Sequence, residues 1–238
     1  MDPIIFEQEL GKKGFSLSEQ QKTQFERYFN LLVEWNEKIN LTAITEKNEV
    51  YEKHFYDSIS PVFFFDFTKI KTLIDIGAGA GFPSLPIKIM YPHIEVTIVD
   101  SLNKRIQFLQ HLVQEIQLDQ VTCLHGRAEE LGIMAQHRDR YDAVTARAVA
   151  RLNVLSEYCL PFAKVGGVFI VLKGSDAANE LDEAKKAIKV LGGKTEKMEC
   201  LQLPSEQADR NIIIINKLTS TPKQYPRKAG TPSKKPMV

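Results

Sequence analysis

The stretch TLIDIGAGAGFPSLPIKI, residues 72–89, gives the strongest indication of the fold. An apolar run leads into an acid, and three glycines follow in alternation, Gly77, Gly79 and Gly81. Glycines directly after a buried strand let the backbone approach a ligand at the C-terminal edge of a parallel sheet. A nicotinamide-binding loop has its third glycine one position later, where this chain has Phe82. A tight turn without any ligand is the alternative interpretation.

The sequence around this loop alternates between strand-like and helix-like segments. Short β-branched runs are separated by amphipathic stretches such as NKRIQFLQHLVQEIQL, which indicates a parallel, doubly wound sheet. The last two runs, KTEKMECLQLP and ADRNIIIINKL, are joined without a helix and should pair antiparallel. The pattern therefore predicts an α/β fold that resembles the class I S-adenosylmethionine-dependent methyltransferases. Such a fold is Rossmann-like, with a mostly parallel seven-stranded sheet, an antiparallel last strand and, here, a helical N-terminal extension.

The chain divides into three parts on composition. Residues 1–70 are predicted to form a helical N-terminal segment packed on the core, in which Ser16 and Glu19 suggest a capping box at a helix start. Residues 71–218 are the methyltransferase-like core, and residues 219–238 are a basic C-terminal tail. No acid follows Asp209, whereas lysines and arginines accumulate after it, so the tail is a candidate for binding phosphates.

Composition limits the class of protein. The chain has 238 residues, is 43% hydrophobic and has a formal net charge of +1, as expected for a soluble globular protein. Its three cysteines are odd in number and far apart, which argues against disulfides and against a zinc site, and no metal is expected. The start has acids where a signal peptide is basic, and no apolar run is long enough for a bilayer, so we expect a cytoplasmic protein without membrane contact.

Side chains that follow the other strands are further candidates for a ligand site. Asp100 closes the second strand, where a carboxylate accepts hydrogen bonds from ribose hydroxyls or serves as a helix N-cap. Backbone amides near Ala128 and the Glu129 carboxylate are placed to read an adenine edge, although helix-dipole acids fit the same positions. Arg147, at the end of the fourth strand, and Arg151, one helical turn further, suit a ligand or phosphate; solubility alone is the alternative.

Several longer motifs resemble one known family. They are EWNEKINLTAI, HFYDS, LIDIGAGAGFPSLPIKI, VDSLNKRIQFL, GRAEEL, ARAVARL, LKG and the terminal YPRKAGTPSKKP. With them the chain is similar to the RsmG (GidB) family, bacterial methyltransferases that make 7-methylguanosine in 16S ribosomal RNA. The resemblance covers almost the whole chain. Ser84 and Ala229 depart from the family pattern, which commonly has Gly and Pro there, and neither is a predicted cofactor contact.

The resemblance also implies roles for individual residues. It places Gly77, Phe82, Ala128, Glu129 and Arg147 around S-adenosylmethionine, the expected cofactor. Three residues before the sheet, Asn40, His54 and Asp57, match family motifs without a clear role. A helix-capping Asn and a structural His-Asp pair are alternatives to direct substrate contact.

The chemistry implied by the resemblance agrees with what the sequence lacks. Guanine N7 has a lone pair and no proton, so no general base is needed. The fourth strand ends in TARAV, without the Asn/Asp-Pro-Pro-aromatic loop used on exocyclic amines. No catalytic side chain is therefore assigned, and catalysis is expected to rest on alignment, with Arg147 and Arg151 as candidates for substrate positioning.

The expected partner is 16S ribosomal RNA, within the small ribosomal subunit or an assembly intermediate, and a monomer is expected. The basic residues predicted to contact RNA are Arg151, Arg227, Lys228, Lys234 and Lys235. A methyltransferase acting on a small molecule would share the cofactor loop but would not need the basic tail. A non-catalytic ribosome-assembly factor would keep the tail and tolerate loss of Gly77 or Arg147.

Overall fold

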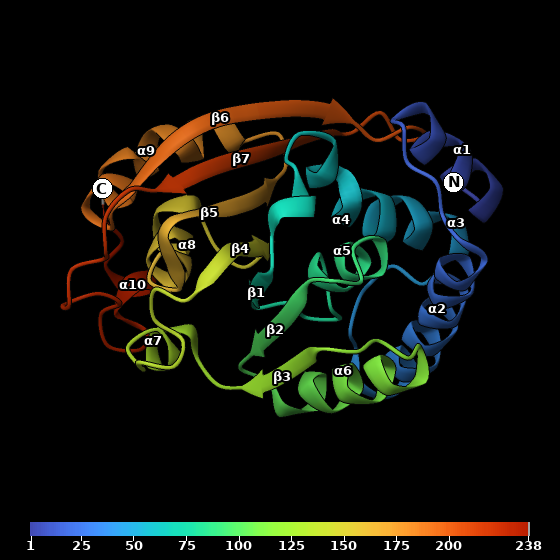
Figure 1. Cartoon of the computed structure of the whole chain (residues 1–238), viewed down its shortest axis with the longest axis horizontal. Coiled ribbons are helices and arrows are strands. Elements are labelled where there is room, and N and C mark those ends of the chain that lie inside the picture. Colours follow the sequence, from blue (N-terminus) through green and yellow to red (C-terminus); the bar gives the residue numbers. More distant parts are fainter. Residues whose placement is uncertain (238) are drawn as a thin grey trace.

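One seven-stranded sheet with helices on both faces forms the centre of the protein (Figure 1). The computed structural model describes residues 1–237. The strands lie across the sheet in the order β3-β2-β1-β4-β5-β7-β6. Their bounds are Thr72–Ile76 for β1, Glu95–Asp100 for β2, Val121–His125 for β3, Tyr141–Arg147 for β4, Ala163–Lys173 for β5, Gly193–Gln202 for β6 and Asp209–Lys217 for β7.

Strand direction confirms the predicted fold class. Strands β1 to β5 pair in parallel, whereas β7 pairs antiparallel with both β5 and β6. The β6–β7 connection is too short for a crossover helix, so the two strands form a hairpin. In β7 the run from Ile212 to Ile215 is fully buried, with alternate side chains in the cores on the two faces. A strand buried on both faces needs such an unbroken apolar run.

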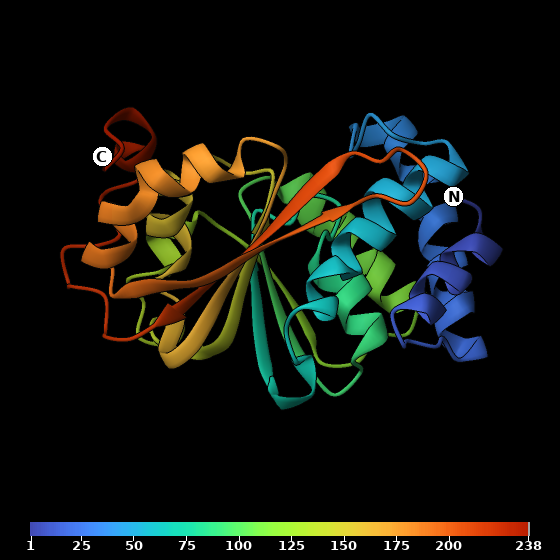
Figure 2. The ribbon, with the colours of Figure 1, turned by 90° about the horizontal axis from the view of Figure 1, so that it is seen from above.

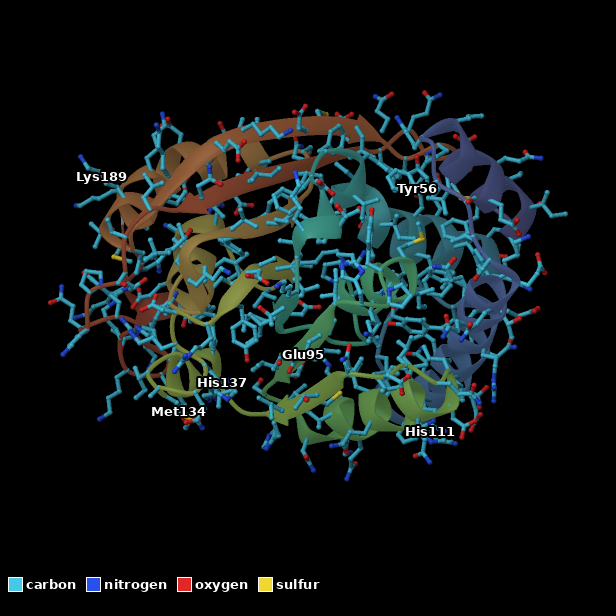
Figure 3. All side chains as sticks on the ribbon, viewed as in Figure 1. Tyr56, Glu95, His111, Met134, His137 and Lys189 are labelled. Atoms are coloured by element: carbon cyan, nitrogen blue, oxygen red, sulfur yellow. The ribbon has the colours of Figure 1, made fainter. Side chains whose placement is uncertain are left out.

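The helices form two layers, one on each side of the sheet (Figure 2). The first layer contains α1 (Pro3–Lys12), α2 (Glu19–Ile39), α3 (Lys47–Glu49), the π-helix η1 (Val50–Tyr56), α4 (Asp57–Ile59), the 3-10 helices η2 (Ser60–Phe63) and η3 (Phe67–Lys69), α5 (Ser84–Met90) and α6 (Asn103–Glu115). The second contains α7 (Ala128–Leu131), α8 (Leu152–Cys159), α9 (Ala177–Val190) and α10 (Thr231–Lys234). Side chains fill the space between the layers and the sheet: Tyr56 is buried there, whereas Lys189 projects from α9 into solvent (Figure 3).

Helix α2 begins two residues later than its sequence motif suggested. Ser18, not Ser16, is the N-cap, and its side chain accepts from the backbone N–H of Gln21, whose side chain bonds back to the cap. Two S-x-x-E/Q patterns overlap at this point, so the motif alone did not choose between them. The Gln21 amide also donates to the carbonyl of Ile89 at 2.7 Å, and this tertiary bond favours the second pattern.

The basic C-terminal segment folds back on the second helical layer. The Arg138 guanidinium donates to backbone carbonyls of Thr221, Pro222 and Tyr225 at 2.6 to 3.2 Å. Arg227 pairs with Glu157 of α8, a carboxylate that is fully buried. The segment is thus held by its backbone as well as by charge. Within residues 1–237 no helix has both the length and the apolar character needed to span a bilayer.

Candidate functional site

The strand order places a ligand crevice between the loops that follow β1 and β4. The chain runs from β1 to β2 and β3 on one side, then returns to add β4 and β5 on the other. In such sheets ligands bind beyond the carboxyl ends of the strands, where the order reverses. The loop after β1 carries the three glycines, and the loop after β4 carries Ala148 and Val149. Val149 packs over Gly77, since a Cβ there would lie 2.8 Å from a Val149 methyl.

Helix α2 contacts the glycine loop and supports it through Tyr28. The Tyr28 hydroxyl donates to the carbonyl of Ala80 at 2.6 Å, and the Tyr28 ring stacks on Phe82 with centroids 5.4 Å apart. Gly81 has φ +97°, and a Cβ there would lie 2.7 Å from the Tyr28 hydroxyl and 2.6 Å from a Leu85 methyl. Only glycine fits this position without moving its neighbours. The sequence showed Tyr28 only as one residue of an apolar helix face, so its support of the loop was missed.

Asp75, the acid inside the glycine motif, fixes the helix that follows the loop. Its carboxylate accepts from the backbone N–H of Ser84, the first residue of α5, at 3.1 Å. The side chain is fully buried, and burial raises the pKa of Asp75 to about 7. Ser84, one of the two departures from the family pattern, therefore contributes its backbone at this contact.

A cavity of about 250 Å³, here called the cofactor cavity, is lined by residues from the loops that follow the first four strands. Its walls include four residues predicted for the cofactor, Gly77, Asp100, Ala128 and Glu129. Asp100 accepts from the N–H groups of Gly79 and Leu102, one on each carboxylate oxygen. Arg105 also donates, at 3.4 Å, to the oxygen that accepts from Gly79, so the oxygen that accepts from Leu102 keeps a further lone pair for a ribose hydroxyl. Of the two roles foreseen for Asp100, the helix N-cap is wrong, because Leu102 is the N-cap of α6 and no side chain caps that helix. Ribose binding stays a prediction.

Glu129 joins the cofactor cavity to the C-terminal segment. One of its carboxylate oxygens accepts from the backbone N–H of Gly230 at 2.9 Å, which leaves the other oxygen for an adenine amino group. Tyr158 lines the same cavity. Glu130 is exposed on α7, as a helix-dipole acid would be. The residues present therefore fit an adenosine ligand.

Arg147 lies in a second cavity, not in the wall of the cofactor cavity. Its guanidinium donates to Asp57 at 2.8 Å and to the carbonyl of Lys53, and it lies over the Phe82 ring at 5.0 Å.

The expected helical turn between Arg147 and Arg151 is wrong. Residues 148–151 form an irregular bend and α8 begins only at residue 152, because Ala148 has φ +55°, outside the helical region.

His54 and Asp57 both contact Arg147. Within residues 1–237 no hydrogen bond joins His54 directly to Asp57. The His54 ring stacks on Phe82 at 4.6 Å, and its Nδ1 faces an Arg147 nitrogen at 3.3 Å. Arg147 can only donate, so Nδ1 accepts and Nε2 carries the proton that it donates to Thr42 at 2.8 Å. Burial and the nearby guanidinium lower the pKa of His54 to about 3. The ring is neutral at physiological pH.

The second cavity has a volume of about 450 Å³ and is called the basic cavity below. It is lined by Ile44, Lys53, His54, Asp57, Arg147, Ala148, Leu172, Lys173, Gly174, Glu180 and Arg210. Four of these residues are cations and two are acids. Ala148 lines this cavity and its neighbour Val149 lines the cofactor cavity, so the β4–α8 loop borders both cavities.

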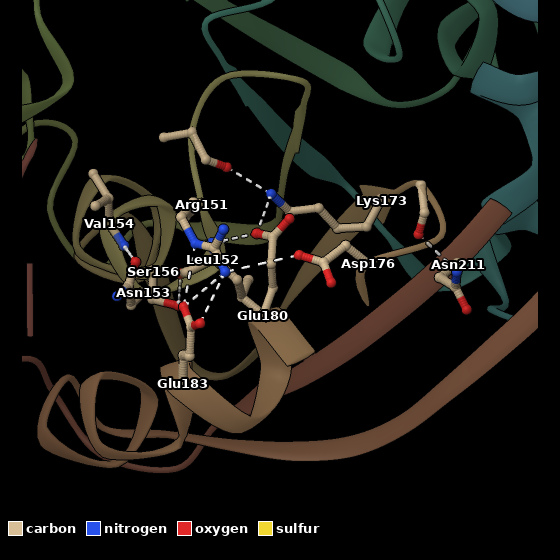
Figure 4. A network of polar contacts seen from close by, with 12 residues as sticks. Arg151, Leu152, Asn153, Val154, Ser156, Lys173, Asp176, Glu180, Glu183 and Asn211 are labelled. Carbon is tan, nitrogen blue, oxygen red and sulfur yellow. Dashed lines mark hydrogen bonds and ion pairs between the residues drawn. The ribbon is translucent and has the colours of Figure 1, made fainter. Parts of the chain in front are cut away.

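The remaining predicted residues have different surroundings. Asn40 ends α2 in the left-handed conformation, so the capping interpretation fits it. Arg151 forms a two-pronged ion pair with Glu183 on α9 (Figure 4). Arg227 is occupied by Glu157. In contrast, within residues 1–237 no carboxylate lies within ion-pair distance of the exposed Lys228, Lys234 and Lys235.

The neutral His54 makes a testable contribution to stability. Its pKa is about 6.5 in the unfolded chain and about 3 in the folded protein, so the unfolded chain binds the extra proton at intermediate pH. Stability is therefore fully present above pH 6.5 and is lost as the pH falls toward 3, by up to about 1.4 kcal/mol per pH unit. Urea unfolding of wild type and of His54→Gln at pH 7.5 and 5 should show the larger loss in wild type.

Asp75 acts in the opposite direction, since its raised pKa gives stability that is lost as the pH rises through 7. Both proteins keep Asp75, so its contribution cancels in the comparison. Equal pH dependence in wild type and His54→Gln would contradict the neutral, buried imidazole.

Comparison with solved structures gives the class of protein. The chain superimposes on the O-methyltransferase from Bacillus cereus in complex with SAH with a TM-score of 0.57, at 12% identity, over 80% of this chain and 90% of that one. At this identity the likeness concerns the fold alone. Together with the antiparallel β7, it defines a class I S-adenosylmethionine-dependent methyltransferase fold.

Sequence comparison gives the family. The model of the GidB family, rRNA small subunit methyltransferase G, matches residues 21–213. The chain is 59% identical to ribosomal RNA small subunit methyltransferase G of Brevibacillus brevis, over 98% of each chain. It is also 59% identical to the Bacillus subtilis protein of that name, over 96% of this chain and 95% of that one. The chain belongs to the rRNA small subunit methyltransferase G family.

Proposed function

We propose that the protein transfers a methyl group from S-adenosylmethionine to N7 of a guanine in 16S ribosomal RNA. The observation that carries this proposal is the pair of cavities that the β4–α8 loop borders on both sides. The cofactor cavity suits an adenosine, and the basic cavity beyond Ala148 suits a nucleotide. Membership of the family supports the RNA substrate.

The side chains around the two cavities have roles in binding and orientation. Bound S-adenosylmethionine would supply an electrophilic methyl group on a sulfonium; the lone pair of N7 would form the new bond and the C–S electron pair would return to sulfur. Asp100 would hold the ribose and Glu129 the adenine amino group. Arg147, fixed by Asp57 and Phe82, would orient the nucleotide in the basic cavity. N7 loses no proton, so no general base is required.

The C-terminal segment adds a surface for the RNA backbone. Lys228, Lys234 and Lys235 are exposed in or near α10, and Gly230 of the same segment contacts Glu129 at the cofactor cavity. Cations at this position would bind phosphates and make affinity depend on salt without selecting the base. We propose a cytoplasmic monomer that meets its RNA within the small ribosomal subunit or an assembly intermediate.

The proposed function has a direct test. Nucleosides from small-subunit RNA of cells with and without the gene are compared by mass spectrometry, and purified protein with labelled S-adenosylmethionine is then added to the deficient subunits. Loss and restoration of one 7-methylguanosine is the expected result. An unchanged nucleoside profile with cofactor still bound would favour methylation of a small molecule. RNA binding that survives with no methylation would favour an assembly factor.

A further inference from the structure

The basic cavity has two acids, Asp57 and Glu180. Asp57 pairs with Arg147, whereas Glu180 does not. Glu180 lies in the first turn of α9, after β5, and its side chain is 14% exposed. One carboxylate oxygen, Oε2, accepts from the backbone N–H of Leu152 at 2.7 Å and pairs with Lys173 at 2.8 Å (Figure 4). The other oxygen, Oε1, accepts no hydrogen bond from residues 1–237. An acceptor with free capacity thus belongs to the wall of the cavity.

The carboxylate is held firmly in place. Lys173 is itself fixed, because it donates to the carbonyl of Ala150 at 2.6 Å in the β4–α8 loop. Leu152 begins α8, and its N–H is one of the unpaired donors at a helix start that Glu180 satisfies. The Lys173 ammonium lies 2.8 Å from Oε2 and forms an ion pair with it. A ligand that enters the cavity therefore meets a fixed, negatively charged acceptor.

We infer that Glu180 accepts hydrogen bonds from the Watson–Crick edge of the target guanine. This inference rests on the proposed function and adds the means by which guanine is selected. Guanine presents two adjacent donors on that edge, N1–H and the 2-amino group, whereas adenine and cytosine present an acceptor at the ring nitrogen. N7 lies on the other, Hoogsteen edge of the purine. A base held through its Watson–Crick edge by Glu180 therefore keeps its Hoogsteen edge, with N7, free of that contact and available to the methyl donor.

The same contact would favour the reaction itself. Methylation at N7 leaves the purine with a positive charge, and that charge makes N1–H a stronger donor. The hydrogen bond from N1–H to a fixed carboxylate is therefore stronger in the transition state than in the ground state. Three other cations of the cavity have acidic partners of their own, which reduces their opposition to this charge: Arg147 and Arg210 share Asp57, and Lys53 pairs with Glu206.

The substitution Glu180→Gln would reverse the polarity of this contact. Leu152 N–H and Lys173 both donate, so the oxygen of the new side-chain amide has to face them and its NH₂ group faces the cavity. Two sets of donors would then meet at the guanine edge. Glu183, one turn along α9, pairs with the exposed Arg151 outside the cavity, which makes Glu183→Gln the matched control.

The test compares RNA that has guanosine at the methylated position with RNA that has inosine there, since inosine lacks only the 2-amino group. Loss of one hydrogen bond to a charged acceptor is worth about 1.5 to 3 kcal/mol, so wild type should methylate the inosine RNA roughly 10- to 100-fold less efficiently in kcat/KM. Glu180→Gln should methylate both slowly and at nearly equal rates. Glu183→Gln should keep the wild-type ratio of guanosine to inosine.

A purely structural role for Glu180 gives a different result. Damage to α8 or to Lys173 lowers both rates together and leaves the ratio unchanged, so an unchanged ratio in Glu180→Gln would overturn the inference. Equal rates of wild type on the two RNAs would overturn it as well. If wild type forms no 7-methylguanosine on any RNA, the proposed function itself fails. Binding of S-adenosylmethionine to each variant verifies that the cofactor cavity is intact.

Discussion

Replacement of Arg147 by alanine is expected to lower the free energy of unfolding by about 3 kcal/mol and to slow methyl transfer by about 100-fold or more. The Asp57 side chain is 7% exposed and would lose its partner at 2.8 Å, keeping only the less well aligned Arg210 at 3.3 Å. A buried carboxylate without a close partner is strongly destabilising. His54 and Phe82 would lose the guanidinium that they face. Urea unfolding and a methylation assay measure the two effects.

Two other substitutions act as controls for this result. Arg147→Lys keeps the charge but not the planar fork, so it should recover part of the stability and little of the activity. Arg151→Ala removes a solvent-exposed ion pair with Glu183 and should leave stability close to wild type. Because Arg147 lines the basic cavity, Arg147→Ala should weaken RNA binding more than cofactor binding. If Arg147→Ala lost affinity for S-adenosylmethionine alone, Arg147 would be a cofactor-binding residue, as the sequence predicted.

Replacement of Arg227 by alanine should also cost about 3 kcal/mol of stability, for a related reason. The Glu157 side chain is 1% exposed and is held by the Arg227 guanidinium at 2.6 Å. Arg227→Ala keeps the backbone N–H of residue 227 as a donor to Glu157 but removes the guanidinium. We expect the C-terminal segment to be held less firmly on α8 and the bond from Gly230 to Glu129 to weaken with it. We therefore expect weaker S-adenosylmethionine binding, measured by calorimetry, from a substitution outside the cofactor cavity. Wild-type affinity in a destabilised Arg227→Ala protein would contradict this coupling.

Neutralisation of the exposed lysines provides the matched comparison. Replacing Lys228, Lys234 and Lys235 by serine should leave unfolding unchanged and reduce both RNA affinity and its salt dependence. Deletion of the segment after Lys217 is a less informative experiment. It removes Arg227 and the backbone that Arg138 holds, so activity would fall even if RNA were not the substrate.

The sequence was a good guide to the features that depend on local patterns. The glycine spacing, the alternation of strands and helices, and the hairpin at the end each follow from residues close together in the chain, and they predicted the fold. The same holds for Asp100, Ala128 and Glu129, because loops after parallel strands meet at one edge of the sheet. Their contact with S-adenosylmethionine stays a prediction, as do the boundaries at residues 70 and 218.

Contacts between distant parts of the chain could not be foreseen. Arg147 reaches Asp57 across 90 positions, and Arg227 reaches Glu157 across 70. No periodicity or motif spacing indicates such a partner, and an arginine has the same sequence signature whether it binds phosphate or a buried carboxylate. For that reason Arg227 appeared among the candidates for RNA contact.

The contact between Tyr28 and Ala80 limits how the protein could be recombined with its relatives. The first helical layer supplies the hydroxyl that supports the glycine loop, and the sheet supplies the carbonyl that receives it. A chimera with the N-terminal layer of another protein would keep this glycine loop but would lack the Tyr28 hydroxyl that supports it. The two parts are expected to be exchangeable only together, or with a tyrosine kept where Tyr28 now stands.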